Sequence, residues 1–416
     1  MSKKSVAYGK FVRYFWKRPK LAKEILKLGI KLELARRRVV ANIKNDFASW
    51  VDSVALSIVS SAFEGGKIAL VNLFFPVEIM AGFNLKCVSA EGLAGMLAAM
   101  HLEDLALNRA EAMGISKNTC SFHRAGLGLN LLKMVSNAKV VAATNALCDG
   151  NVPIFKTIAQ IHGLDPLIVD VPRTFDQSSV HSVSQQLEGI VHELENELNQ
   201  SFNYSKFEEQ LKIESEIFGT LRELYPKLCE NPVGLHLYQH VNLLYALHVR
   251  PDVHMLKAVR ALRKQLDSNA PTFKKRFLWM HLSPYYDNVL NDIFSKDSQY
   301  SVVASELSWD WLNWKIDVAH PFKCLAEKIL SNPLLGDVET RAKFALRLAF
   351  DFKVDGVIHF NHFGCKQSSG SVEILKNAFD EVRIPFLSLD GDCVDHTSAS
   401  FEQYKTRIQA FLEMIG

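Results

Sequence analysis

Hydrophobic residues recur at two different spacings along this chain, and the change of spacing divides it into segments. In the first 64 residues, apolar positions return every three or four residues from Leu21 to Ile43 and again from Asp46 to Phe63. This period is typical of amphipathic helices, and Gly65 and Gly66 then provide a helix stop. Short apolar runs bounded by turn residues follow, and such runs predict buried strands. The pattern therefore predicts a helical N-terminal extension followed by mixed structure.

The predicted strands alternate with predicted helices in two parts of the chain. The strands are Ile68–Phe75, Lys139–Thr144, Pro166–Val171, Phe277–Leu282, Ser301–Leu307, Gly356–Phe360 and Ile384–Leu389. Helices are predicted at Leu93–Asn108, Thr119–Val135, much of Ser182–Leu266 and Phe401–Ile415. Alternation of this kind predicts an α/β fold with parallel sheets wound on both faces. We divide the chain into a basic helical arm (1–64), a first α/β domain (65–200), and a helical segment with a second α/β domain (201–416).

Charge is distributed unevenly between the arm and the rest of the chain. The net charge is +3, yet residues 1–44 contain fourteen Lys and Arg against Glu24 and Glu33, so this segment is +12 and the remainder −9. A basic amphipathic helix can lie on anionic lipid, dock an acidic partner or pack on its own chain. We expect protein docking or packing rather than lipid binding. No recognition fold accompanies the charge, so nucleic acid is not an expected partner.

The number of cysteines and their cellular setting limit the roles that we expect for them. There are seven, an odd number, in a chain whose N-terminus lacks the apolar core of a secretory signal. This argues against a disulfide framework and makes the cytoplasm the expected location. No run of 18 apolar residues occurs, so we expect no membrane span. Unpaired cysteines in such a protein are buried small hydrophobes, reactive thiols or metal ligands.

Three of the cysteines occupy places where α/β proteins bind ligands. Cys148 follows the strand Lys139–Thr144 and Cys365 follows Gly356–Phe360. Open sheets bind ligands outside the carboxyl ends of their strands. Cys120 stands at a predicted helix start, where the helix dipole favours anions such as thiolates. Simple packing is the commoner role of a free cysteine, and the spacing matches neither a zinc ribbon nor a ferredoxin. Position alone therefore leaves the role open.

The segments around these cysteines resemble the cluster-ligand motifs of one family, the 2-hydroxyacyl-CoA dehydratases and benzoyl-CoA reductases, which includes the 2-hydroxyglutaryl-CoA dehydratase D-component. The similar segments, in the family's order, are Cys120-Ser-Phe-His-Arg-Ala-Gly-Leu-Gly128, Thr144-Asn-Ala-Leu-Cys148-Asp-Gly150 and Asp355-Gly-Val-Ile-His-Phe-Asn-His-Phe-Gly-Cys365. The ending, Ile384-Pro-Phe-Leu-Ser-Leu-Asp390-Gly-Asp392 with the helix that contains Arg407, also resembles the family's. The resemblance runs from about residue 70 to the C-terminus.

This resemblance implies a fold, a cofactor and partners. It implies two Rossmann-like doubly wound domains with a [4Fe–4S] cluster between them, held by Cys120, Cys148 and Cys365. Three thiolates leave one iron open, and an open position is what a catalytic metal needs. The chain would be the iron–sulfur subunit of a lyase that dehydrates a 2-hydroxyacyl-CoA substrate through a ketyl radical. An ATP-dependent iron–sulfur activator protein would supply the electron. A related second subunit, or a second copy of the chain, would complete the enzyme.

Polar side chains accompany the cysteine motifs. His123, Arg124 and His362 are the candidate catalytic residues, and His359 lies in the same motif as His362. Such groups adjust a cluster through hydrogen bonds or donate a proton. They also simply satisfy helix and strand ends, and this alternative stays open. Of the remaining cysteines, we expect core packing for Cys87, Cys229 and Cys324. Cys393 stands near a strand end, and lining the site is the less common of its two possible roles.

Other functions are excluded or left open by the motifs. Neither a phosphate-binding glycine loop nor a complete dinucleotide fingerprint is present, so we expect no ATP hydrolysis or NAD binding in this chain. Dehydration and ring reduction use the same three-cysteine frame, so a benzoyl-CoA reductase-type subunit remains an alternative. Two further hypotheses are a non-catalytic partner subunit and a family relative that acts on something other than an acyl-CoA.

Overall fold

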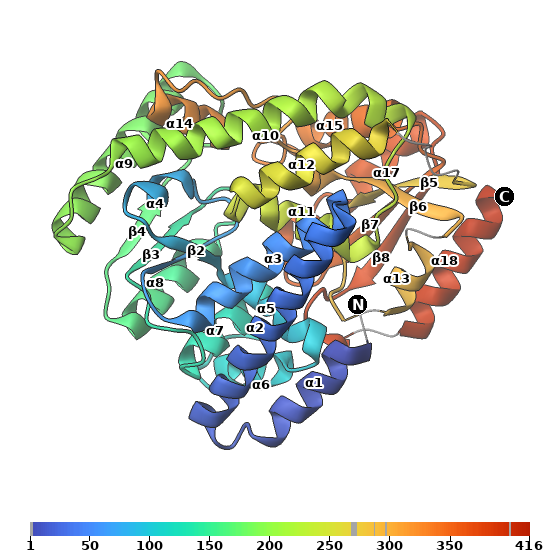
Figure 1. Cartoon of the computed structure of the whole chain (residues 1–416). Coiled ribbons are helices and arrows are strands. Elements are labelled where there is room, and N and C mark those ends of the chain that lie inside the picture. Colours follow the sequence, from blue (N-terminus) through green and yellow to red (C-terminus); the bar gives the residue numbers. More distant parts are fainter. Residues whose placement is uncertain (1–2, 268–272, 287, 296–297, 399–400) are drawn as a thin grey trace.

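Two four-stranded parallel sheets form the core of the protein, and Figure 1 shows them on opposite sides of the molecule. The computed structural model describes residues 3–267, 273–286, 288–295, 298–398 and 401–416. The first sheet contains β1 (Ile68–Val71), β2 (Lys86–Ser89), β3 (Val140–Thr144) and β4 (Pro166–Val169). The second contains β5 (Lys275–Met280), β6 (Tyr300–Ser305), β7 (Gly356–His362) and β8 (Phe386–Gly391). The predicted α/β class with two parallel sheets is confirmed.

Both sheets have the same strand order. The orders are β2-β1-β3-β4 and β6-β5-β7-β8, so each sheet places its second, first, third and fourth strands side by side. Strands β1 and β3 are paired, as are β5 and β7. In this order the winding direction reverses between the first and third strands, and ligands bind outside the carboxyl ends of the strands at such a switch point. The two halves of the chain therefore repeat one topology with one expected binding position each.

Helices pack on both faces of the sheets and between them. In chain order they are α1 (Lys3–Tyr14), α2 (Pro19–Lys44), α3 (Phe47–Glu64), α4 (Glu78–Gly82), α5 (Ala90–Met100), α6 (Glu103–Glu111), α7 (Ser121–Leu131), α8 (Asn151–His162), α9 (Gln177–Leu198), α10 (Tyr204–Glu230), α11 (Leu237–Val249), α12 (Val253–Leu266), α13 (Asn288–Ile293), α14 (Pro321–Leu330), α15 (Val338–Asp351), α16 (Lys366–Ser369), α17 (Val372–Glu381) and α18 (Phe401–Ile415). None of these helices, as far as the chain is described, is long and apolar enough to cross a membrane.

Alternate residues of β5 show how the second sheet is covered on both faces. Phe277 packs its ring against Phe294 and Phe411, on the side of α13 and α18. Leu278 and Met280 belong to a second apolar cluster, which includes residues of α15 and α17. Because successive side chains of a strand point to opposite faces, a strand that is buried on both sides must be apolar throughout, as the sequence pattern indicates.

The long helices of the middle region connect the two halves. Figure 1 shows α10 running from the neighbourhood of α9 and α14 toward α15, with α12 and α11 beneath it. Its apolar residues share a core with three tryptophans of the second half, Trp309, Trp311 and Trp314, which are all buried. These three tryptophans therefore pack in the core.

The basic arm packs back on its own chain. Helix α2 lies along α3 (Figure 1), and the Arg13 guanidinium on α1 forms an ion pair of 2.5 Å with Asp104 of α6. The residues at the ends of the predicted apolar face are not the buried ones, since Leu21 and Ile43 are 40% and 78% exposed. The face that packs is made instead by Ala22, Leu26, Ile30, Leu34 and Ala41.

Candidate functional site

The three cysteines of the predicted cluster motifs lie near one another, between the two sheets. Cys148 follows β3 and Cys365 follows β7, which are the strands at the two switch points, and Cys120 is the N-cap residue of α7. Their thiols interact electrostatically. Burial is the largest cause that raises the pKa of Cys120, and the neighbouring thiols of Cys365 and Cys148 raise it further. Burial also raises the pKa of Cys148 most, followed by the thiol of Cys365.

A glycine allows the two halves to approach at this point. Gly364 has a φ of +77°, and a Cβ atom on it would lie 2.9 Å from the backbone nitrogen of Cys120 and 3.0 Å from the carbonyl oxygen of Asn118. A real Cβ atom would clash with this backbone, so only glycine fits. The loop that holds Cys365 therefore lies directly against the helix start that holds Cys120.

The thiols are held in their protonated form by their surroundings. Burial raises the pKa of Cys120 and Cys365, and it raises the pKa of Cys148 to about 11. Solvent reaches Cys148, yet the protein around its sulfur still disfavours the charged form. Backbone N–H groups of the residues that follow each cysteine act in the opposite direction. Iron would stabilise the thiolates directly, because a bound cation deprotonates its thiol ligands.

His362 connects the second domain to Cys120. Its Nε2 atom is 3.3 Å from the Cys120 sulfur, and its Nδ1 atom accepts a hydrogen bond of 3.0 Å from the backbone N–H of Cys393. The ring stacks on His281 and meets the edge of Phe122. Burial lowers the pKa of His362 and favours the neutral ring.

His123 occupies the corresponding place beside Cys148. The side-chain amide of Asn151 donates to the carbonyl oxygen of Thr144 at 3.2 Å, so its oxygen faces the Nε2 atom of His123 at 2.9 Å. A Cβ atom on Gly150 would lie 2.9 Å from the His123 ring and 3.4 Å from the Cys148 sulfur. The imidazole of His123 and the thiol of Cys148 therefore both lie close to the would-be Cβ position of this glycine.

Arg124, the third candidate catalytic residue, is engaged by the scaffold. Its Nη1 atom lies 2.5 Å from a carboxylate oxygen of Glu111, and its Nε atom donates to the carbonyl oxygen of Thr119 at 2.9 Å. These bonds hold the loop that precedes α7. The geometry favours a structural role for Arg124, whereas His123 and His362 face the cysteines.

Two residues near the cysteines were missed by the sequence analysis. Glu91 follows β2 and is close enough to Cys148 to raise the pKa of that thiol, while burial raises the pKa of Glu91 itself. His281 follows β5, has a φ of 66° and stacks on His362 with the rings 5.9 Å apart. Both stand at carboxyl ends of strands. The rule that located Cys148 and Cys365 could have found them had it been applied to every polar residue there.

The other cysteines and charged motif residues have the expected surroundings. Three of the cysteines are buried away from the site, as expected: Cys87, Cys229 and Cys324. Cys393 is fully buried at the border of the site, with its sulfur 3.6 Å from the carbonyl oxygen of Leu282. In the C-terminal motif, Arg407 lies 3.8 Å from Asp390, which is a scaffold contact.

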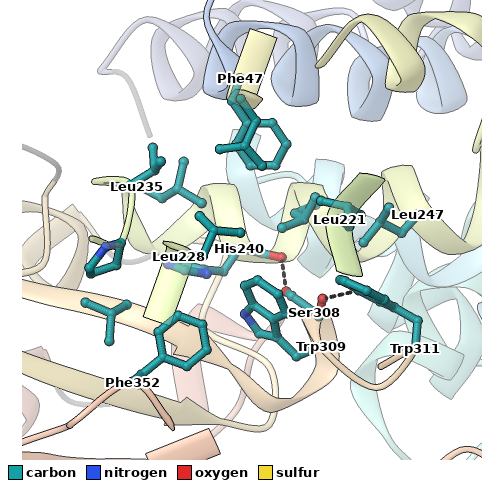
Figure 2. Close-up of a pocket in the computed structure, with 15 residues that line it drawn as sticks. Phe47, Leu221, Leu228, Leu235, His240, Leu247, Ser308, Trp309, Trp311 and Phe352 are labelled. Carbon is teal, nitrogen blue, oxygen red and sulfur yellow. Dashed lines mark hydrogen bonds between the residues drawn. The ribbon is translucent and has the colours of Figure 1, made fainter. Parts of the chain in front are cut away.

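Two hollows elsewhere in the molecule do not belong to this site. A cavity of about 30 Å³ between the middle helices and the second sheet is lined by Phe47, His240 and Trp309, among others (Figure 2). It is far smaller than the roughly 300–1,000 Å³ of ligand pockets. An open groove of about 630 Å³, lined by Lys67 and Lys86, lies at the amino ends of β1 and β2. That is the edge of the first sheet opposite to the cysteines.

The donor set fits a cluster better than a single ion. Within the described ranges, no three His, Cys, Asp or Glu side chains are close enough together to hold one metal ion. A four-iron cluster binds each thiolate to a different iron, so its ligands stand further apart than those of one ion. Three thiols of two domains, with backbone N–H groups directed at their sulfurs, provide the soft ligands that such clusters require.

The chain is similar in sequence to alpha subunits of several 2-hydroxyacyl-CoA dehydratases. The (R)-phenyllactyl-CoA dehydratase alpha subunit of Clostridium sporogenes is 25% identical over 376 residues, covering 84% of this chain and 90% of that protein. The (R)-2-hydroxyisocaproyl-CoA dehydratase alpha subunit of Clostridioides difficile is 21% identical, covering 85% and 91%. Subunit alpha of the (R)-2-hydroxyglutaryl-CoA dehydratase of Acidaminococcus fermentans is 24% identical, covering 66% and 59%.

A family model covers most of the chain but not the basic arm. It describes the 2-hydroxyglutaryl-CoA dehydratase D-component and matches residues 72–415. The matched segment begins just after β1 and contains the other seven strands and all three cysteines of the site. The chain therefore belongs to the 2-hydroxyglutaryl-CoA dehydratase D-component family.

Proposed function

We propose that this chain is the iron–sulfur subunit of a 2-hydroxyacyl-CoA dehydratase, with a [4Fe–4S] cluster on Cys120, Cys148 and Cys365. The observation that supports this proposal is the approach of three thiols from two domains, at the switch points of two sheets with one topology. The relatives are named as dehydratase subunits, which favours dehydration over the reduction of an aromatic thioester.

The chemistry that we propose is the removal of water from an acyl-CoA through a ketyl radical of the substrate. A bound cluster would supply one electron and a Lewis-acidic position for the thioester. The chain itself supplies the three thiolates, the imidazole of His362 against one of them, and two titratable groups beside Cys148. These two groups, Glu91 and His123, are placed to accept or return the proton of the substrate.

The proposal includes partners in a cytoplasmic setting. The electron would come from an ATP-hydrolysing iron–sulfur activator protein, because this chain has no phosphate-binding glycine loop of its own. A related second subunit would complete the enzyme, since the relatives are named as alpha subunits. Sustained conversion of a 2-hydroxyacyl-CoA by the purified chain without an activator would contradict this part of the proposal.

Anaerobic reconstitution with iron and sulfide tests the cluster directly. We expect about four iron atoms per chain, as a single cubane requires. Replacing Cys120, Cys148 or Cys365 by Ser should leave the cluster labile or absent, whereas Cys229→Ser, a buried cysteine outside the site, should bind as much iron as the unaltered chain. Stoichiometric iron in a variant that lacks all three thiols would refute the assignment.

A further inference from the structure

His362 is fixed on both of its ring nitrogens, and this determines which of them carries the proton. The backbone N–H of Cys393 points at Nδ1 from 3.0 Å, so Nδ1 must act as an acceptor. A neutral imidazole has one donor and one acceptor nitrogen. The proton therefore resides on Nε2, the atom that lies 3.3 Å from the sulfur of Cys120. The pair is an N–H donor facing a sulfur acceptor.

The ring has little freedom to leave this position. It is buried, stacks on His281 with an interplanar angle of 17°, and meets Phe122 edge to face at 5.5 Å. His281 is itself held in a left-handed backbone conformation, with a φ of 66°. Its backbone N–H donates a hydrogen bond of 2.6 Å to the carboxylate of Glu306. Backbone strain of this kind costs about 1–3 kcal/mol and persists where the surroundings fix it, often at functional sites.

We propose that His362 is a positioning residue for Cys120, which donates Nε2–H to the ligand sulfur and thereby raises the reduction potential of the cluster. This inference rests on the proposed function. A hydrogen bond to a thiolate withdraws electron density from the sulfur and favours the reduced, more negative cluster. Because His362 belongs to the second domain and Cys120 to the first, the bond also joins the two domains at the cluster.

A merely structural role for His362 would have a different signature. The ring fills space between Phe122 and His281, and its loss would lower stability whatever faces the sulfur. Two substitutions separate the effects. His362→Gln keeps an N–H donor at about the reach of Nε2, and His362→Leu fills part of the space without a donor. His240→Leu is a matched control, because the ring of His240 is also buried and, among the described residues, hydrogen-bonds only to the carbonyl oxygen of Val302.

The experiment uses the full chain reconstituted anaerobically with iron and sulfide. We measure iron content, the midpoint potential of the cluster by EPR-monitored titration, and the thermal stability of the iron-free chain. His362→Leu should shift the midpoint potential to more negative values, His362→Gln should keep most of the original value, and His240→Leu should lower stability without a shift. Loss of the cluster in the Leu variant alone also supports the donor role.

Other outcomes overturn the inference, and they distinguish it from failure of the proposed function. An unshifted potential in His362→Leu with a full cluster rejects the role of the hydrogen bond and leaves the cluster assignment intact. If the midpoint potential falls equally, or iron is lost equally, in the Gln and Leu variants, the N–H donor is irrelevant and His362 acts through packing. A chain that binds no cluster under any condition rejects both proposals.

Discussion

The residues immediately before Cys148 and Cys365 share an unusual backbone conformation. Leu147 has a φ of 62° and Gly364 a φ of +77°, so both lie in the left-handed region. They stand at equivalent places, after the third strand of each sheet. For a bulky residue such as leucine this conformation costs about 1–2 kcal/mol. In both domains a left-handed residue therefore directly precedes the cysteine that faces the other domain.

Replacing Gly364 by Ala should disturb the site more than the backbone angle alone explains. The left-handed φ costs roughly 1–2 kcal/mol in any such position. At Gly364 the added methyl also meets the backbone of Cys120 and Asn118. Gly163 is the matched control, because it has a φ of +68° and no atom within 4 Å of its would-be Cβ.

We expect Gly163→Ala to lower the thermal unfolding midpoint of the iron-free chain slightly. Gly364→Ala should lower it clearly more and also weaken iron binding after reconstitution. Thermal unfolding followed by circular dichroism, together with iron analysis, makes the comparison. Equal effects of the two substitutions would show that the contact with Cys120 is unimportant.

Helices and strands with a clear hydrophobic period were predicted correctly, whereas the interruptions within them were not. Helix Phe401–Ile415 is confirmed, and so is the helical character of the middle region. The single helix predicted for Leu93–Asn108 is instead two, because His101 ends α5 with a left-handed φ of 54° and α6 begins at Glu103. Strand β2 has only four residues, which include Cys87; the sequence around Cys87 is strand-like but gives no bounds for the strand. Such breaks depend on tertiary contacts, which the pattern of one segment does not contain.

Three helices are joined by a buried charge network that links the two halves. The ammonium of Lys328 on α14 lies 2.5 Å from the carboxylate of Glu78 on α4 and 3.9 Å from that of Glu214 on α10. Burial and the nearby Glu78 raise the pKa of Glu214 well above its usual range, so Glu214 retains its proton. The carboxylate of Glu78 is thus balanced by the ammonium of Lys328.

Lys328→Met should destabilise the protein strongly, because it leaves the carboxylate of Glu78 buried without its cation. Breaking a buried pair in this way costs about 3–5 kcal/mol. The control is Lys376→Met, which removes an exposed ion pair with Asp380 on α17. Such a pair is worth about 0.3–0.5 kcal/mol. Chemical denaturation of both variants gives the comparison, and similar losses in the two would mean that the network contributes no more than a surface pair.

At the scale of the whole molecule, contacts between residues distant in the sequence join the two domains. Ser121 on α7 donates to the carboxylate of Asp392 at 2.6 Å, across 271 residues of sequence. His396, just beyond β8, hydrogen-bonds to Glu103 at the start of α6 and packs its ring against His101. The local motifs identified the three cysteines, but they could not reveal these partners, which become neighbours only when the domains dock.

The contact between His396 and Glu103 should make domain docking depend on pH. The hydrogen bond to Glu103 raises the pKa of His396 above its ordinary value of 6.5. The folded protein therefore binds a proton that the unfolded chain releases, so the stabilisation is complete below pH 6.5 and is lost as pH rises through the folded pKa.

We expect the unfolding midpoint of the unaltered chain to fall between pH 6 and pH 8 by more than that of His396→Gln. His192→Gln, at an exposed histidine on α9, should follow the unaltered chain. Thermal unfolding at a series of pH values is the measurement. Identical pH profiles for the unaltered chain and His396→Gln would show that this contact does not titrate in the expected range.

The order of the cysteines along the chain has a consequence for how the protein matures in the cell. Cys120 and Cys148 belong to a sheet that ends at Val169, whereas Cys365 follows β7 much later. At about 5–20 residues per second, the ribosome needs roughly 10–40 s to pass from Cys148 to Cys365. A cluster held by all three thiols therefore cannot be inserted as the first domain emerges. Insertion of such a cluster would have to await the emergence of Cys365, and until then only two of its three proposed ligands would be present.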